Sequence, residues 1–150
     1  MVSQRDVDTS DSTVVEVTRR FATSPERLFD AWLDQSKARG FLFASEDGRI
    51  VDIKIDPRVG GTFQVTDRRA DQDVNHIGVY HVLKRPRTLV FGLSVPRYSL
   101  RWSRVHIEIL SVPGGSHLNL IHAQVSRADV ESTRAEWILA LERLAKTLNV

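Results

Sequence analysis

The feature that most constrains the fold is an amphipathic helix predicted over residues 131–148. At about 100° per residue, Trp137, Leu141, Leu144 and Leu148 fall within one narrow sector of the helical wheel. An isolated helix of this length is only marginally stable in water, so tertiary packing must stabilise it. Another layer of the protein is therefore expected to cover the apolar stripe.

Residues beside the stripe are expected to widen it, and two residues do not fit the amphipathic pattern. Ile138 and Ala145 are expected to widen the apolar stripe on one side, and Ala140 on the other. Arg134 lies inside the apolar sector, and Leu139 lies on the polar side. A charge in an apolar sector needs a partner or access to water. Arg134 could therefore anchor a ligand carboxylate or phosphate at a cavity mouth, or pack its stem while its guanidinium reaches water.

The composition is typical of a single globular domain. The chain has 150 residues, of which 41% are hydrophobic and 27% charged, which favours an ordered protein over a disordered one. The 21 Lys and Arg against 19 Asp and Glu give a formal charge of +2, which gives little support to nucleic-acid binding. With no cysteine, disulfides, thiolate nucleophiles and cysteine zinc sites are excluded.

The chain divides into a tail and one domain. Residues 1–12 are polar and lack periodicity, which predicts a flexible N-terminal tail before a domain over residues 13–150. No apolar run approaches the roughly 18 residues that a membrane-spanning helix needs, and the tail has no apolar region typical of a secretory signal. We therefore expect a cytoplasmic protein without membrane insertion.

Short β-rich segments make up most of the remaining sequence. Ser24 and Pro25 favour a short helix after the first of them, and residues 34–39 a second one that ends at Gly40. Because no helix separates the later strands, they should form an antiparallel meander. The predicted strands are 13–21, 50–56, 62–68, 76–83, 88–93, 100–110 and 117–125.

These elements predict an α+β fold. A single curved, seven-stranded antiparallel sheet can bury one face against one amphipathic helix. In this arrangement the sheet wraps around the long C-terminal helix, and the two short helices follow the first strand.

Five motifs along residues 13–148 add a resemblance. They are Ala22-Thr23-Ser24-Pro25-Glu26; Pro57, Gly60, Gly61 and Phe63; Gly78, Tyr80, Pro86, Leu89 and Phe91; Gly114, Gly115, Leu118, Leu120 and His122; and Trp137, Leu141 and Leu144. In this order and spacing the chain resembles the activator of heat shock protein 90 ATPase homologue family. That family lies within the START-like (SRPBCC) helix-grip superfamily.

The resemblance implies a cavity between the sheet and the long helix. Many proteins of the superfamily bind lipids, sterols, polyketides or other apolar molecules there, and some are cyclases. The sequence departs from the family pattern at two places. Residues 39–43 replace a usual pair of tryptophans, and Glu136 stands where Gly often precedes the helix Trp. Both lie near the expected cavity mouth, so the ligand does not transfer from relatives.

The candidate cavity residues combine apolar walls with a few polar groups. Tyr80 could supply a hydroxyl or could simply be packed, and the apolar set could equally fill a solid core. The predicted wall consists of Phe63, Val65, Phe91, Trp137 and Leu141, with Tyr80, His122 and Arg134 as the polar candidates.

His122 shares strand parity with Leu118 and Leu120, so it should face the helix. It could donate to a ligand or act as a general base, but a core histidine satisfied by neighbours is the favoured interpretation. His76 and His81 are five residues apart and point to opposite faces, so no metal site is expected.

The leading hypothesis is a non-catalytic pocket that binds a small hydrophobic or amphipathic ligand without a cofactor. One alternative is a co-chaperone-like module in the stress response, with a chaperone partner and an exposed Leu139 as its local support. Another is a polyketide-cyclase-like enzyme with His122 as general base. No nucleic-acid partner is expected, and the protein should be a monomer or a homodimer.

Overall fold

A computed structural model describes residues 12–150 of the chain. The predicted N-terminal tail lies outside the described residues, except Ser12, which begins the first strand. The elements are β1 (Ser12–Phe21), α2 (Pro25–Leu33), α3 (Gln35–Ala38), β2 (Arg49–Ile55), β3 (Thr62–Arg69), β4 (Gln72–Lys84), β5 (Thr88–Ser94), β6 (Ser103–Val112), β7 (Gly115–Ser126), the 3-10 turn η1 (Arg127–Asp129) and α4 (Val130–Leu148).

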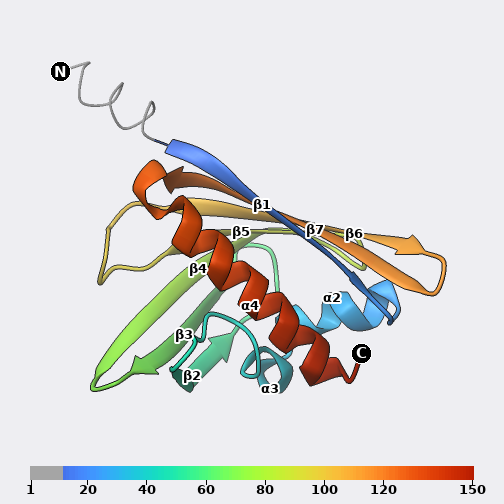
Figure 1. Cartoon of the computed structure of the whole chain (residues 1–150), viewed down its shortest axis with the longest axis horizontal. Coiled ribbons are helices and arrows are strands. Elements are labelled where there is room, and N and C mark those ends of the chain that lie inside the picture. Colours follow the sequence, from blue (N-terminus) through green and yellow to red (C-terminus); the bar gives the residue numbers. More distant parts are fainter. Residues whose placement is uncertain (1–11) are drawn as a thin grey trace.

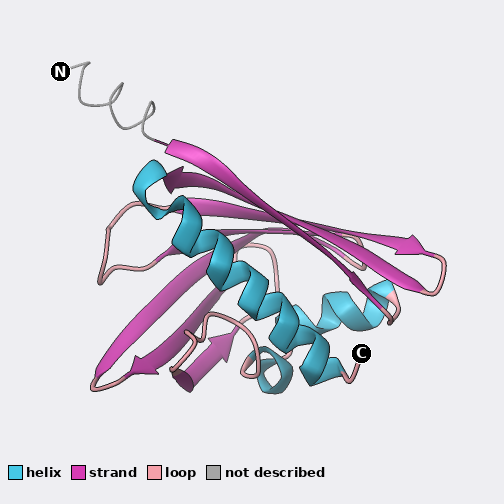
Figure 2. Ribbon diagram, in the orientation of Figure 1, coloured by secondary structure: helices cyan, strands magenta, loops and turns pink. Residues whose placement is uncertain are grey.

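The strands form one seven-stranded sheet in the order β1-β7-β6-β5-β4-β3-β2. Every neighbouring pair is antiparallel. The sheet curves, α4 crosses its concave face, and α2 and α3 lie near the C-terminal end of α4 (Figures 1 and 2). This is the helix-grip fold, so the predicted fold class is confirmed.

The apolar stripe of α4 forms the centre of the core. Trp137 is 4% exposed and Leu141 1%, while Leu144 and Leu148 are fully buried. The prediction for one flank is wrong in part, because Ile138 is 46% exposed. This flank is therefore buried only towards the C-terminal half of α4, where Ala145 is 4% exposed.

Two predicted strand starts need correction. β4 begins at Gln72 rather than at residue 76, because the β3–β4 hairpin turns tightly at Ala70, whose φ is 54°. β6 begins at Ser103 rather than at residue 100, because the β5–β6 register pairs Ser103 with Leu93. Residues 95–102 consequently form a connecting loop.

Side-chain caps position the two short helices. The Ser24 hydroxyl accepts a hydrogen bond from the Arg27 backbone N–H, and the Asp34 carboxylate accepts from the N–H groups of Ser36 and Lys37. The Arg27 guanidinium also donates to the Leu148 carbonyl oxygen at 2.8 Å. This contact links α2 to the last turn of α4, whose final carbonyl groups have no partner within the helix.

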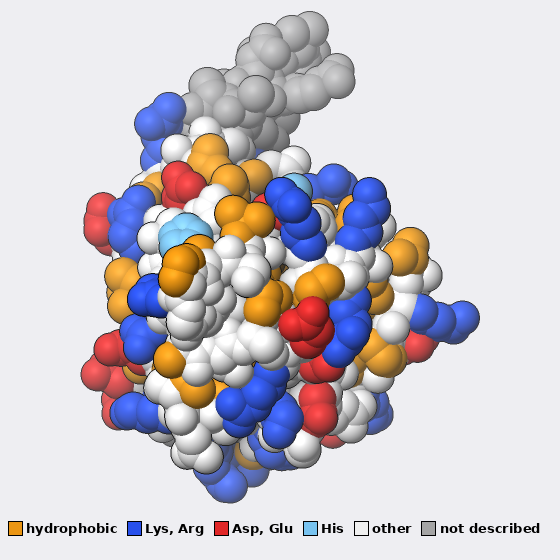
Figure 3. All heavy atoms as spheres, turned by 90° about the vertical axis from the view of Figure 1, so that its right-hand side faces the viewer, with side chains coloured by type: hydrophobic (Ala, Val, Ile, Leu, Met, Phe, Trp, Pro, Cys, Tyr) orange, Lys and Arg blue, Asp and Glu red, His pale blue; other side chains and the backbone are white. Residues whose placement is uncertain are grey.

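Within the described residues, no helix has the length and apolar character needed to cross a membrane. The same part of the chain holds no cluster of three or more His, Asp or Glu side chains able to hold a metal ion. Basic and acidic side chains are interspersed on the face that Figure 3 shows. That face carries no extended patch of one charge.

Candidate functional site

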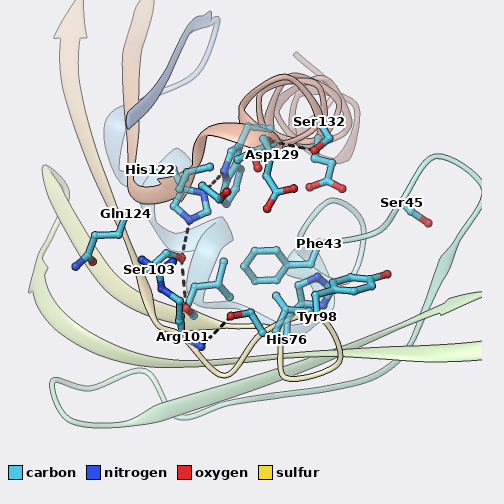
Figure 4. Close-up of a pocket in the computed structure, with 18 of the residues that line it drawn as sticks. Phe43, Ser45, His76, Tyr98, Arg101, Ser103, His122, Gln124, Asp129 and Ser132 are labelled. Atoms are coloured by element: carbon cyan, nitrogen blue, oxygen red, sulfur yellow. Dashed lines mark hydrogen bonds between the residues drawn. The ribbon is translucent and has the colours of Figure 1, made fainter. Parts of the chain in front are cut away.

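A cavity of about 610 Å³ lies between the sheet and the first half of α4. Its walls come from β4, β5, β7, α4 and the ring of Phe43, and its mouth is bordered by Ala44, Ser45 and the loop of residues 95–102 (Figure 4). Leu93, Val125 and Trp137 contribute apolar surface. Ser132, Thr133 and Glu136 of α4 bring polar groups to the mouth.

His122 lies in the cavity wall within a chain of hydrogen bonds. The Trp137 indole N–H donates to His122 Nδ1 at 3.0 Å, and His122 Nε2 lies 2.7 Å from Ser103 Oγ. The Ser103 hydroxyl is 3.3 Å from the Leu93 carbonyl oxygen. An indole N–H only donates and a carbonyl only accepts. His122 therefore carries its proton on Nε2 and donates it to Ser103, which donates to Leu93.

This chain of hydrogen bonds determines what His122 can do. The side chain is 7% exposed, and burial lowers the pKa of His122 from 6.5 to about 4. The ring is consequently neutral at pH 7, and both nitrogens have partners. A general base needs a free lone pair, whereas the lone pair on Nδ1 accepts from Trp137. The geometry supports the satisfied core histidine and weighs against the cyclase alternative.

His76 is a second buried histidine in the wall, and sequence reasoning considered it only as a metal ligand. Its side chain is 6% exposed, and its Nδ1 lies 3.3 Å from the Val65 carbonyl oxygen. Nδ1 must donate in this pair, so Nε2 is left as an acceptor. Burial, with help from the charge of Arg69, lowers the pKa of His76 to about 4. This wall therefore offers a neutral ring at pH 7.

An ionic cluster joins the two sides of the mouth. Arg69 Nε donates to the fully buried Asp67 carboxylate at 2.6 Å, and Arg69 Nη1 donates to the Tyr98 hydroxyl at 3.1 Å. The Ser45 backbone N–H donates to the same Asp67 oxygen at 3.1 Å. Arg69 and Asp67 thus connect the segment of residues 43–48 to the loop of residues 95–102. Partial desolvation raises the pKa of Glu136, which faces this cluster from α4.

Phe43 is one of the cavity residues that sequence reasoning missed. Its ring points from the α3–β2 connection into the space between α4 and the sheet (Figure 4). The backbone has φ of 65°, a region that costs a bulky residue on the order of 1–3 kcal/mol. The signal in the sequence is the run Phe41-Leu42-Phe43 directly after a helix-ending glycine. Phe41 and Leu42 are buried in the core, and Phe43 is partly buried between the two layers.

Only two of the eight predicted cavity residues, His122 and Trp137, line this cavity. Phe63, Tyr80 and Phe91 pack against one another with ring centroids 5.2–6.5 Å apart. Val65 and Leu141 are buried in the same core. None of these five residues lines the cavity, and the Phe43 ring packs against two of them, Phe63 and Phe91.

Arg134 is the eighth predicted residue and also lies outside the cavity lining. Its Nη1 is 3.4 Å from the Glu131 carboxylate, and its side chain is 38% exposed. The guanidinium reaches the surface, where a carboxylate one turn earlier on α4 partners it. This geometry matches the interpretation in which Arg134 packs its stem and extends its charge to water.

Comparison with known proteins identifies the family. The family model described as "Activator of Hsp90 ATPase homolog 1-like protein" matches residues 22–149. The chain belongs to this family. A comparison with curated proteins finds no significant match. The Hsp90 ATPase activator homologue family and its helix-grip relatives commonly bind hydrophobic ligands.

Solved structures show the same fold at low sequence identity. A protein from Chromobacterium violaceum is 20% identical with a TM-score of 0.82, over 89% of this chain and 94% of that chain. An AHSA1-like protein from Aeromonas hydrophila is 17% identical with a TM-score of 0.78, over 91% and 92%. CalU16 from Micromonospora echinospora is 20% identical with a TM-score of 0.71, over 91% and 76%.

The two departures from the family pattern both lie at the cavity. Phe43 belongs to the segment that replaces the usual tryptophan pair, and Glu136 stands where the family often has Gly. Both side chains line the cavity. Two positions at which this member of the Hsp90 ATPase activator homologue family departs from the expected pattern therefore contribute to its pocket.

Proposed function

We propose that the protein binds a small amphipathic molecule in the cavity between the sheet and α4. The supporting observation is the cavity itself, whose volume of about 610 Å³ falls within the range of roughly 300–1,000 Å³ of ordinary ligand sites. An inner wall of Leu93, Val125 and Trp137 meets a polar mouth with Arg69 and Glu136. A ligand with an apolar body and a polar end matches this distribution.

Burial of apolar surface would supply most of the binding free energy. Each Å² of apolar ligand surface removed from water contributes roughly 25 cal/mol, and the polar groups at the mouth would set the ligand's orientation. The mouth holds Arg69 and Arg101 together with Asp129 and Glu136. Because both charges are present, the polar end of the ligand need not be anionic.

Native mass spectrometry of the purified protein is the direct test. We expect a co-purified small molecule, or uptake of the fluorescent amphiphile 1-anilinonaphthalene-8-sulfonate with one-to-one stoichiometry. If the purified protein carries no bound molecule and the folded protein shows no saturable uptake of this probe, the proposal is contradicted.

A cavity-filling variant tests whether binding occurs at this site. Thr133 is half-buried and lines the cavity, so Thr133→Trp should place a ring in it and weaken probe binding at least ten-fold. Glu142→Trp is the matched control, because Glu142 is exposed on the same helix and does not line the cavity. Equal binding by the two variants would place the probe elsewhere on the protein.

A second candidate function is a co-chaperone-like interaction with the heat-shock chaperone ATPase. The loop of residues 95–102 favours it, because Tyr98, Leu100 and Trp102 are 63%, 83% and 47% exposed. Leu139, the residue first considered for this role, is half-buried. If this candidate holds, purified protein should stimulate the chaperone's ATPase, and Leu100→Ser should reduce the stimulation. An unchanged ATPase rate at saturating protein would rule it out.

A further inference from the structure

We infer that Phe43 is a specificity-determining residue, which closes the inner end of the cavity and restricts it to short or single-ring amphiphiles. This inference rests on the proposed ligand binding and adds the size class of the ligand. Among the aromatic residues of residues 12–150, Phe43 alone both lines the cavity and makes ring contacts with Phe63 and Phe91. It therefore stands at the boundary between the cavity and the solid core.

The Phe43 ring spans the gap between the two layers of the fold. Its centroid lies 5.9 Å from that of Phe63 and 6.4 Å from that of Phe91, both on the sheet. It lies 5.8 Å from the Trp137 ring on α4. On its fourth side it stacks on His76 at 4.7 Å, with the two planes 8° apart. A ring in contact with both layers leaves no passage for a chain to continue between them.

The space beyond this ring is apolar and closed. Phe63, Tyr80 and Phe91 are 4%, 3% and 2% exposed, and none of them lines the cavity. Removal of the Phe43 ring would join this aromatic cluster to the cavity. An engineered apolar cavity of about 150 Å³ in another protein stays dry and binds benzene. The opened space should likewise accept the apolar end of a ligand.

The surrounding structure holds Phe43 in place. Its positive φ is disfavoured for a bulky side chain, so other interactions must maintain this backbone. Arg143 of α4 donates hydrogen bonds to the carbonyl oxygens of Ala44, Ser45 and Glu46 at 3.0–3.1 Å. These bonds fix the segment that follows Phe43 and thereby keep its ring directed into the cavity.

The size class of the ligand follows from these positions. The 610 Å³ extends outward to the polar side chains of the mouth, so only its inner part is available to an apolar body. A long acyl chain would have to displace Phe43 or leave its end in water. A single ring can instead stack within the wall formed by Phe43 and Trp137, and a short chain ends before it meets Phe43.

A chain-length series tests the inference. Straight-chain carboxylates from hexanoate to palmitate would compete with bound 1-anilinonaphthalene-8-sulfonate, in the wild type and in Phe43→Ala. Each buried methylene should raise affinity about four-fold, until the chain reaches the closed end and affinity stops rising. We expect this plateau to move by at least two methylenes in Phe43→Ala, which is a gain of about sixteen-fold for the longer chains.

Phe41→Ala is the matched control. Phe41 lies two residues earlier, is fully buried against the edge of Trp32, and does not line the cavity. Phe41→Ala removes the same phenyl ring as Phe43→Ala, but it should leave the plateau at the wild-type chain length. Phe43→Leu is the milder variant to use if Phe43→Ala melts below the assay temperature, and it should move the plateau in the same direction.

The outcomes separate the two proposals. A wild-type protein that binds neither the fluorescent probe nor any carboxylate would overturn the proposed function and this inference with it. A wild-type protein that binds, together with a folded Phe43→Ala that keeps the same plateau, would overturn the inference alone. A plateau that moves equally in Phe41→Ala would also overturn it.

Discussion

At the scale of single residues, strand parity identified which side chains face the helix but not what they contact. Parity with Leu118 and Leu120 correctly placed His122 on the buried face. Its partners Trp137 and Ser103 come from α4 and β6. Whether Trp137 reaches His122 depends on the position of α4 along the strands of the sheet. Sequence periodicity carries no information about that translation.

The buried histidines make stability depend on pH. The pKa of His76 and of His122 is about 4 in the folded protein, against about 6.5 in an unfolded chain. Between pH 6.5 and 4 the unfolded chain binds protons that the folded protein does not, so stability is lost as pH falls. We expect the free energy of unfolding to fall by about 2 kcal/mol per histidine between pH 8 and pH 5.

Urea unfolding at a series of pH values measures this dependence. His76→Gln and His122→Gln should each remove about half of the loss, and His81→Gln, at an exposed position on β4, is the control variant. Equal slopes in all four proteins would show that these buried rings do not carry the effect.

At the scale of elements, the α3–β2 connection is anchored by side chains from α4 and β3. Its middle is held by Arg143 and by the Asp67 carboxylate that accepts from Ser45. Composition predicted an apolar patch in a connection, and the structure confirms that the patch exists, with Phe41 and Leu42 buried and Phe43 and Ala44 partly buried. The conformation could not be predicted, because a positive φ at a phenylalanine arises from tertiary contacts rather than from local preference.

Arg143→Met should loosen this connection. It removes three hydrogen bonds to backbone carbonyl groups, and one charged hydrogen bond contributes about 1.5–3 kcal/mol. Because the three share one guanidinium, we expect a total loss of about 2–3 kcal/mol in unfolding free energy. Amide hydrogen exchange over residues 43–48 should accelerate more than elsewhere.

Arg134→Met is the control on the same helix. Its ion pair with Glu131 has side chains 38% and 90% exposed, and such surface pairs contribute less than about 1 kcal/mol. A loss as large as that of Arg143→Met would show that the carbonyl contacts are not what distinguishes the two arginines.

At the scale of the whole molecule, the fold was predictable because its main constraint, the periodicity of apolar residues in α4 and in the strands, can be read directly along the sequence. The stripe of α4 required a cover, and the alternating strands supplied one sheet with one apolar face. The cavity was less predictable. Whether a concave sheet and a helix enclose space depends on which side chain enters between them, and here Phe43 enters from a connection outside both layers.

Leu144→Ala tests how much the packing of the apolar stripe of α4 contributes to the stability of the fold. Leu144 is fully buried, and such truncations cost about 2–5 kcal/mol. Chemical denaturation should show this loss. Glu142→Ala, at an exposed position on the opposite face of α4, should change the free energy of unfolding by less than about 0.5 kcal/mol. A loss below about 1 kcal/mol in Leu144→Ala would mean that the stripe contributes little to the core.

The pairing of β1 with β7 has a consequence for the order in which the protein acquires its structure during synthesis. Ser12 is the partner of Ser126, and Phe21 that of Ser116, so the first strand of the sheet cannot pair until the last strand has been synthesised. The β2–β5 hairpins connect neighbouring segments and can pair early. Their concave face stays uncovered until α4 leaves the ribosome, and exposed apolar surface of this kind promotes aggregation. The nascent domain is therefore most prone to aggregation just before α4 emerges.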